Sequence, residues 1–425
     1  NKLYTDEKNR SIISKLLSYS ICMKPVVIVF LFIIHIISCQ NNNIDEYNQI
    51  KTFDIKKLPK VTSLKLSDLG FIDIEYIPLE TSQKSLIQRT INIGSYRDRI
   101  IVGNNSFIIK EFNNILKFKS DGTFVAKIGT QGRGPNEFLT CHDVETDEKG
   151  QIYIVDGWNN KLFIYNEIGE YIKTVNFPLS RAVEFRFVEG TFLCYSQNNL
   201  GNVENSYNLI DTTGIIIKSY PNQFPFTKYS SDAYGFMHEN LFYRFNDRLF
   251  KKEVYSDTVY TYEKLKFKPH LIIDVGEKLI TPEARSQFAG LDLAKRYISP
   301  RNLFEFGDYV YYEFTFGFEL SLNGSISENY CFIGSKKNDF NVLIKQGEGL
   351  INDLDGGTNI MPLVIKDNNT IVACVDASQL KAHIKSDAFI SSNPKYHHKK
   401  KELIKLANSL TETDNPVLIL VKLKK

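Results

Sequence analysis

The 425-residue sequence contains few of the patterns that usually signal chemistry. It has six cysteines, and none of them form a CxxC pair of the kind found at redox and metal sites. Its seven histidines are scattered without an HxH or HExxH pattern, and no serine lies in a GxSxG elbow. These absences exclude the common zinc-hydrolase and serine-hydrolase motifs. The sequence therefore predicts no catalytic residue, no metal ligand and no cofactor.

Net charge is also missing. The chain has 52 Lys and Arg against 49 Asp and Glu, and removing the five basic and two acidic residues of segment 1–38 leaves 47 of each. Nucleic-acid binding needs a basic face, so we predict no nucleic-acid partner. One basic cluster stands out, Lys395–Lys405. It is typical of a solvated helix face, with a partner site as the alternative.

Long apolar runs are limited to one near the amino terminus. Val26–Ile37 is too short to span a membrane but has the length of a signal-peptide core. It is followed by Ser38 and Cys39, which resemble a lipobox whose cysteine is acylated, although Ile37 departs from the usual small residue. An uncleaved anchor or a buried strand are the alternatives.

These features divide the chain into three segments. We predict a signal peptide over 1–38, with Met23 as an alternative start, and a lipid-anchored tether over 39–63 that shows no clear period. A folded domain over 64–425 follows. The predicted location is the bacterial cell envelope, with the outer membrane favoured and its periplasmic or surface face left open.

Repeated hairpins are the most informative feature that is present. Polar turns containing one glycine separate alternating strands, and the turns at Gly122, Gly169 and Gly214 are 47 and 45 residues apart. A second series of turns, each preceding the second strand of a unit, is predicted at Gly150, Gly190 and Asn240. Such periods are typical of propeller blades. We therefore predict an all-β, six-bladed β-propeller of four-stranded antiparallel blades, with seven blades as the alternative.

Two helical insertions and a closing pair of strands complete the predicted domain. Thr281 and Pro282 are typical of a helix start and predict a helix over 282–297, and apolar spacing predicts another over 395–410. A propeller must close its ring, so we expect Phe71–Glu80 to share one blade with Pro416–Leu423. Two independent edge strands are the alternative.

Several segments resemble a known family. These are IGTQGRGPNEF, DEKGQIYIVD, SDTVY, NDLDGG and the terminal NPVLILVKLK. Together they look like the six-bladed β-propeller lipoproteins of Gram-negative anaerobes, which are related to NHL-repeat propellers. The resemblance covers about residues 64–425. It implies an envelope location and a binding role. We predict a monomeric, non-enzymatic binding or scaffolding module whose partner is a glycan, a peptide or an envelope protein, and a purely structural partner of an envelope complex is a further alternative.

The same resemblance supplies an alternative function. Some NHL-type propellers are metal-dependent lyases whose histidines converge on the central channel from different blades. In this sequence His142 and His238 lie near predicted innermost strands and could face that channel. A metal-dependent lyase or hydrolase is therefore the second hypothesis.

The candidate ligand site is placed where chain segments cross between blades, because such crossings deliver side chains to the channel mouth. An arginine fork there could fix an acidic or hydroxylated ligand while an aromatic ring covers its apolar face. For Trp158, packing against the next blade is the alternative to an exposed surface. The candidates are Arg133, Asn136 and His142 of one crossing, Arg181 of the next, and Asp156, Trp158 and Asn159 of the DGWNN turn.

Two further patterns have structural interpretations. NDLDGG over 352–357 resembles a fragment of a calcium loop but lacks its distal glutamate. Cys194, Cys331 and Cys374 lie in apolar strand patterns and are most simply small buried hydrophobic residues. A disulfide among these three and Cys141 in an oxidising envelope is the alternative.

Overall fold

The computed structural model describes residues 50–59, 61–88, 98–103, 105–179, 182–228, 236, 238–321, 324–345 and 347–424. The predicted signal peptide, Cys39 and the first part of the predicted tether lie outside these residues. Residues from Thr52 onward form one compact unit, to which the following description applies.

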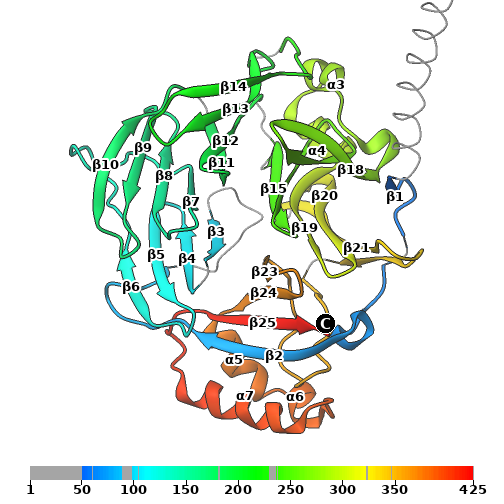
Figure 1. The fold of residues 1–425 in the computed structure, drawn as a ribbon. Coiled ribbons are helices and arrows are strands. Elements are labelled where there is room, and N and C mark those ends of the chain that lie inside the picture. Colours follow the sequence, from blue (N-terminus) through cyan, green and yellow to red (C-terminus); the bar gives the residue numbers. More distant parts are fainter. Residues whose placement is uncertain are drawn as a thin grey trace, which may run out of the picture. The chain divides into compact units, whose positions relative to one another are not determined.

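Six antiparallel sheets are arranged as blades around a central channel, which confirms the six-bladed β-propeller (Figure 1). From the inside outward, blade one contains β3 (Asp98–Val102), β4 (Ser106–Glu111), β5 (Asn114–Lys119) and β6 (Phe124–Lys127). Blade two contains β7 (Asp143–Thr146), β8 (Ile152–Asp156), β9 (Lys161–Tyr165) and β10 (Tyr171–Asn176). Blade three contains β11 (Ala182–Val188), β12 (Thr191–Ser196), β13 (Asn205–Asp211) and β14 (Ile216–Pro221).

The remaining blades carry the additions to the basic repeat. Blade four contains β15 (Asn240–Phe245), β16 (Arg248–Glu253), β17 (Thr258–Glu263), β18 (Lys266–Asp274) and, as a fifth strand, β1 (Lys51–Asp54). Blade five contains β19 (Ser299–Phe306), β20 (Tyr309–Ser321), β21 (Gly324–Ser335) and β22 (Asn341–Lys345). Blade six contains β23 (Val364–Asp367), β24 (Thr370–Val375), β25 (Val417–Leu423) and β2 (Phe71–Pro78).

Blade six closes the ring as predicted. β2 pairs antiparallel with β25, from Phe71 opposite Leu423 to Pro78 opposite Val417. Because β2 precedes blade one in sequence and β25 follows all other strands, this pairing ties the two ends of the propeller domain into one sheet.

Strand burial follows position within a blade. β8 is buried at every residue, because its sheet is covered on both faces by neighbouring blades. The outermost strand β10 is mostly exposed. The turn glycines Gly122, Gly169 and Gly214 have φ of 88°, 88° and 91°, a region that a glycine adopts without the steric cost of a side chain.

The second turn series was predicted correctly at two positions and wrongly at the third. Gly150 precedes β8 and Gly190 precedes β12, but Asn240 begins the innermost strand β15. The matching turn of blade four is formed by Asn246 and Asp247, with φ of 48° and 57°. Asn240 is buried and its amide hydrogen-bonds two other side chains, so its presence reflects a polar network rather than a turn.

The predicted helix over 282–297 is two helices, α3 (Pro282–Gln287) and α4 (Gly290–Arg296). Thr281 caps α3 as predicted, accepting a 3.1 Å hydrogen bond from the Ala284 N–H. The break follows from extended backbone at Phe288 and Ala289. There the Lys228 ammonium donates a 2.9 Å hydrogen bond to the Phe288 carbonyl, at the end of α3.

A helical insertion follows β24 and precedes β25. It contains α5 (Ala377–Ile384), α6 (Asp387–Ser391) and α7 (His397–Ser409), and Figure 1 shows it on the outer side of β25 and β2. α7 confirms the predicted helix, with Leu403 and Ala407 buried. Short 3-10 helices lie at Leu66–Leu69 and Gly276–Lys278. None of the helices in the described residues combines the length and apolar character needed to cross a membrane.

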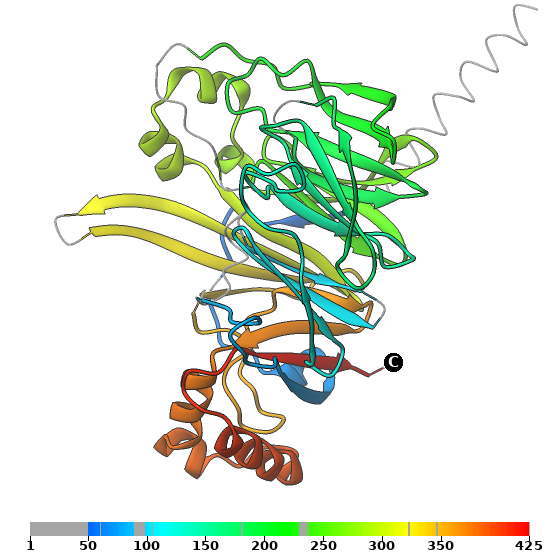
Figure 2. The same ribbon diagram turned by 90° about the vertical axis from the view of Figure 1, so that its left-hand side faces the viewer.

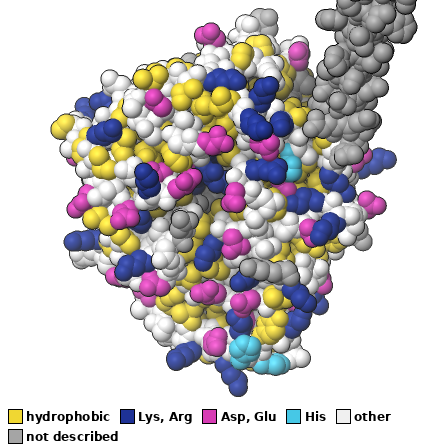
Figure 3. All heavy atoms as spheres, viewed as in Figure 1, with side chains coloured by type: hydrophobic (Ala, Val, Ile, Leu, Met, Phe, Trp, Pro, Cys, Tyr) yellow, Lys and Arg dark blue, Asp and Glu magenta, His cyan; other side chains and the backbone are white. Residues whose placement is uncertain are grey.

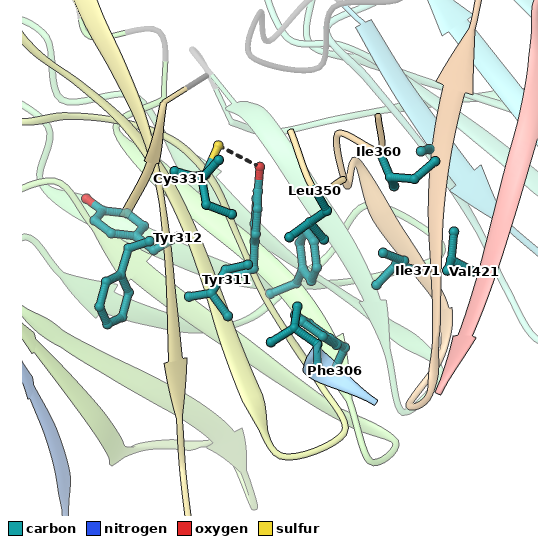
Figure 4. Packing of buried hydrophobic residues seen from close by; sticks show 14 of the residues in the cluster. Phe306, Tyr311, Tyr312, Cys331, Leu350, Ile360, Ile371 and Val421 are labelled. Carbon is teal, nitrogen blue, oxygen red and sulfur yellow. Dashed lines mark hydrogen bonds between the residues drawn. The ribbon is translucent and has the colours of Figure 1, made fainter. Parts of the chain in front are cut away.

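The largest hydrophobic cluster joins blades four, five and six. Figure 4 shows part of it, in which Ile371 and Val421 of blade six face side chains from blade five. The Tyr311 hydroxyl donates a 3.2 Å hydrogen bond to Cys331 Sγ within it. Cys141, Cys194 and Cys331 are buried, Cys374 is partly buried, and all four are free thiols in the described structure.

Blade five also extends outward as an arm. β20 pairs with β19 only as far as Thr315, and β21 pairs with β22 only from Tyr330. The rest of β20 and β21 is a two-stranded hairpin that extends beyond the ring in Figure 2. Figure 3 shows basic and acidic side chains interspersed over the face of the ring, as the balanced composition predicts.

Candidate functional site

The amino-terminal ends of the innermost strands surround a small cavity of about 120 Å³ in the channel. Each blade's first strand runs in the same sense along the channel, so these ends gather at one mouth. We call it the amino-terminal mouth. Its polar lining residues are Arg99, His142, Asp143, Glu184, Arg186, His238, Asn240, Arg301 and Asn302.

A network of four charged residues links blades one, two and three at this mouth. Asp143 accepts 2.7 Å hydrogen bonds from Arg99 Nη1 and Arg186 Nη1, so one carboxylate bridges two guanidinium groups from neighbouring blades. Glu145, two residues along β7, lies 3.3 Å from Arg99 Nη2 and 3.8 Å from Arg186 Nε. Burial alone would raise the pKa of the Asp143 carboxyl, but Arg99 and Arg186 outweigh it and hold that pKa below 3.8.

His142 precedes β7 and lines the cavity as an uncharged ring. Its Nδ1 accepts a 3.1 Å hydrogen bond from the Gly157 N–H, which assigns the ring proton to Nε2. Burial lowers the pKa of His142 to about 4, and the carboxylate of Asp156, 4.0 Å from Nδ1, opposes this only in part. At neutral pH the imidazole therefore offers an N–H donor without a charge.

His238 is positioned by a second network on the other side of the cavity. Its Nδ1 lies 3.9 Å from Glu184 Oε1, and Glu184 Oε2 accepts a 3.0 Å hydrogen bond from the Asn240 amide. The Asn240 oxygen in turn accepts a 2.7 Å hydrogen bond from the Tyr207 hydroxyl. The buried His238 Nε2 has no hydrogen-bond partner among the described residues. This nitrogen is the unsatisfied group of the site.

Blade five contributes a further ion pair. Arg301 Nε lies 3.3 Å from the buried Glu313 carboxylate, which also accepts a 3.3 Å hydrogen bond from the Tyr311 hydroxyl. Burial raises the pKa of Glu313, and Arg301 limits the rise. Asn302 fixes the adjacent blade by donating to the Leu363 carbonyl at 2.8 Å.

The structure brings some of the predicted site residues together and separates others. Trp158 lies beside His142 with ring centroids 5.6 Å apart, and it is 62% exposed rather than packed against the next blade. Arg133, Asn136 and Asn159 are exposed outside the cavity lining.

Two of the predicted residues have other outcomes. Asp156 is buried and accepts backbone hydrogen bonds at 2.9 and 3.2 Å from Leu139 and Thr140, so it anchors the crossing. Arg181 lies outside the described residues. Of the predicted ligand-binding residues that the structure describes, His142 alone lines the cavity.

Sequence reasoning did not identify the guanidinium and carboxylate groups of the channel. Arg99, Asp143 and Arg186 occupy alternating positions of innermost strands, a pattern that any exposed strand face also shows. The expectation that His142 and His238 both face the channel is confirmed. In the described part of the chain, no three His, Cys, Asp or Glu residues are grouped so as to hold a metal ion.

Comparisons with known proteins show a family and a fold. The chain matches the family described as "Domain of unknown function (DUF4934)" over residues 50–422. A Bacteroides fragilis protein thought to be exported has a similar solved structure, with a TM-score of 0.60 at 18% identity, covering 86% of this chain and 98% of that one. At that identity the likeness shows the fold alone. Among curated proteins none matches this chain.

Two other solved structures are less similar. A member of the duf4221 family from Bacteroides vulgatus gives a TM-score of 0.48 at 13% identity, covering 83% of this chain and 97% of that one. A virginiamycin B lyase from Staphylococcus aureus gives 0.32 at 10% identity, covering 64% and 99%.

Proposed function

Because the chain belongs to the DUF4934 family, whose description names no function, we propose a function from the channel itself. The protein is a non-enzymatic binding module that receives the end of a glycan or peptide at the amino-terminal mouth. The observation that carries this proposal is the cavity of about 120 Å³ that His142 and His238 line from different blades, beside apolar side chains such as Phe242.

The size of the cavity limits what enters it. Pockets for drug-sized ligands measure roughly 300–1,000 Å³, so a cavity of about 120 Å³ accommodates only one small group of a larger molecule. A single sugar hydroxyl cluster or a peptide amide has that size. The rest of the ligand would lie outside the mouth, where Trp158 offers an exposed ring.

The hydrogen-bonding groups favour a neutral ligand. Arg99 and Arg186 are already neutralised by Asp143 and Glu145, so they hold little attraction for another carboxylate. His142 offers an N–H donor, and His238 offers Nε2, which has no hydrogen-bond partner among the described residues. A hydroxyl or amide group, which both donates and accepts, is complementary to this pair.

The proposal places the protein in the bacterial cell envelope, anchored by lipid at Cys39. The short apolar run before Cys39 supports this location. The balanced charge of the chain supports a partner other than nucleic acid.

The test compares His238→Gln with His398→Gln, because His398 is an exposed residue of α7. Saturation-transfer NMR with neutral disaccharides and with acetylated peptide amides measures binding to each variant. We expect at least one probe class to bind, and His238→Gln to weaken it about tenfold, the effect of roughly 1.4 kcal/mol. Equal binding by both variants would contradict the proposal. Metal-dependent breakdown of a bound probe would instead support the lyase alternative.

A further inference from the structure

The opposite mouth of the channel opens into a much larger cavity of about 1,140 Å³. We call it the carboxy-terminal mouth, because the ends of the innermost strands and the turns that follow them line it. These turns belong to blades one, two, three, four and six. A cavity of this volume exceeds the roughly 300–1,000 Å³ of typical ligand pockets and has room for a molecule of several rings.

Arg244 lies on the floor of this cavity, where the strand β15 reaches it. Side chains two apart share one face of a strand, and Asn240, Phe242 and Arg244 therefore all project toward the channel. Asn240 and Phe242 line the small cavity, whereas Arg244 lines the large one. The Arg244 side chain is exposed to the cavity.

Arg244 lies near two other guanidinium groups, those of Arg99 and Arg186, which already have carboxylate partners. Asp143 and Glu145 contact Arg99 and Arg186. Arg244 hydrogen-bonds the carbonyl oxygen of Phe187, and no carboxylate of the described residues lies within ion-pair distance of it. A guanidinium has five N–H donors, so most of its hydrogen-bonding capacity remains for a ligand.

The surroundings of Arg244 also disfavour a cation without a counterion. Although the side chain is exposed to the cavity, the protein around it desolvates the guanidinium and so lowers the pKa of Arg244. The positive charges of Arg186 and Arg99 lower this pKa further, against the opposing charges of Glu145 and Glu148. An anion bound beside Arg244 would relieve this repulsion.

We propose that the carboxy-terminal mouth is a second binding site, in which Arg244 holds a single carboxylate of a small organic ligand. A carboxylate matches the planar fork of a guanidinium with two parallel hydrogen bonds. The rest of the rim carries acidic and basic side chains in nearly equal number, so Arg244 provides the attraction for a single carboxylate. The acidic residues are Asp147, Glu148, Glu167, Glu189, Asp247, Glu263 and Asp367, and the basic ones are Lys117, Lys119, Lys149, Arg248, Lys264 and Lys366. A monocarboxylate, such as a sugar acid or a short peptide with a free carboxyl end, fits this site.

Arg248 provides a matched control within the same cavity. It also lines the rim, but its Nη1 lies 3.2 Å from Glu263 Oε1, so its charge is already neutralised. A ligand carboxylate should therefore depend on Arg244 and not on Arg248.

The experiment titrates four probes into the full folded protein by calorimetry. Glucuronate and N-acetylalanine carry the carboxylate, and glucose and N-acetylalanine amide are their neutral counterparts. We expect at least one acid to bind more tightly than its neutral counterpart. Arg244→Gln should weaken that binding at least tenfold, Arg244→Lys should weaken it less, and Arg248→Gln should leave it within twofold. Binding of glucuronate would indicate a sugar acid as the ligand, and binding of N-acetylalanine would indicate the carboxyl end of a peptide.

Two results would overturn the proposal. The first is that the acids bind no better than their neutral counterparts. The second is that Arg244→Gln and the unchanged protein bind the acid equally well. Thermal melting confirms that each variant is folded, and Arg244→Lys retains the charge if Arg244→Gln is unstable. His238→Gln should leave acid binding unchanged, so failure at one mouth is distinguishable from failure at the other.

Discussion

Asn246 and Asn368 hydrogen-bond each other across the end of the intervening blade. The Asn246 N–H donates to Asn368 Oδ1 at 2.8 Å, and the Asn368 amide donates to Asn246 Oδ1 at 2.8 Å. The two residues belong to turns of blades four and six, and between them Gly307 of blade five donates its N–H to the Asn368 carbonyl at 2.6 Å. This contact fixes the end of β15, two residues from Arg244.

Replacing Asn368 by Ala should therefore lower the free energy of unfolding by about 1 kcal/mol, because it removes two hydrogen bonds that are partly exposed. Asn368→Asp retains the acceptor for the Asn246 N–H and loses the donor, so its loss should be smaller. Urea unfolding measures both variants. Equal stability of Asn368→Ala and the unchanged protein would show that the contact does not support the ring.

Removal of residues 416–425 should abolish cooperative unfolding. β25 lies between β24 and β2, so its loss exposes two strand edges and uncovers apolar residues such as Val421. Calorimetry should show no melting transition, whereas Lys422→Ser, at an exposed position of the same strand, should melt almost normally. A truncated protein with an unchanged transition would contradict the closure of the ring by this strand.

His142 should make the fold sensitive to mild acid. Its pKa is about 4 in the folded protein, against an ordinary 6.5, so the unfolded chain binds the proton more readily. The contribution of the neutral ring to the free energy of unfolding is complete above pH 6.5, and it is lost as the pH falls toward 4.

That difference in pKa corresponds to a loss on the order of 3 kcal/mol. The measurement is urea unfolding at several pH values between 7 and 4. The unchanged protein should lose stability more steeply than His142→Gln, which has no titrating ring. Parallel curves for the two proteins would show that His142 does not titrate in this range.

The buried pair between Glu239 and Arg285 should be essential for anchoring the α3 insertion. Arg285 Nη2 lies 2.6 Å from Glu239 Oε1, and both side chains are almost completely buried. Glu239→Ala leaves a buried positive charge without this partner, and we expect a loss of about 3–5 kcal/mol.

The control is the exposed pair between Lys295 and Glu319, 3.1 Å apart. Glu319→Ala should change stability by no more than about 0.5 kcal/mol. Chemical denaturation compares the two variants, and similar small losses would indicate that the insertion does not depend on the buried pair.

The sequence before the propeller predicts that Cys39 becomes the acylated amino terminus of the mature protein. Cys39→Ser should then move the protein from the membrane fraction to the soluble fraction without changing its melting temperature. Mass spectrometry of the mature protein checks the terminus. A peptide that spans Ser38 and Cys39 would contradict cleavage at this position.

The repeat could be predicted from sequence because its turns depend on local conformation. Gly122 and Gly169 adopt positive φ, and that requirement appears directly in the sequence. β1 was not predicted, because Lys51–Asp54 is short and lies in a segment without a clear period. Its pairing with β18 is a long-range contact, and part of the predicted tether is therefore built into blade four.

The channel site was harder to predict for a similar reason. His142 could be placed near the channel because it follows a recognisable crossing between blades. The pairing of Arg99 with Asp143 joins two blades, and nothing in either strand alone indicates its partner. Whether an alternating charged residue faces the channel or the solvent depends on the closed ring.

Blade six combines a strand from the beginning of the domain with three strands from its end, and this sets the order in which the blades can fold during biosynthesis. The innermost strands and hairpins of blades one to three can form as soon as each has been made, because their partners are adjacent in sequence. β2 must wait for β25, which is made after every other strand. Until then the nascent domain carries unpaired strand edges, and it is in this interval that it is most exposed to aggregation and most dependent on chaperones.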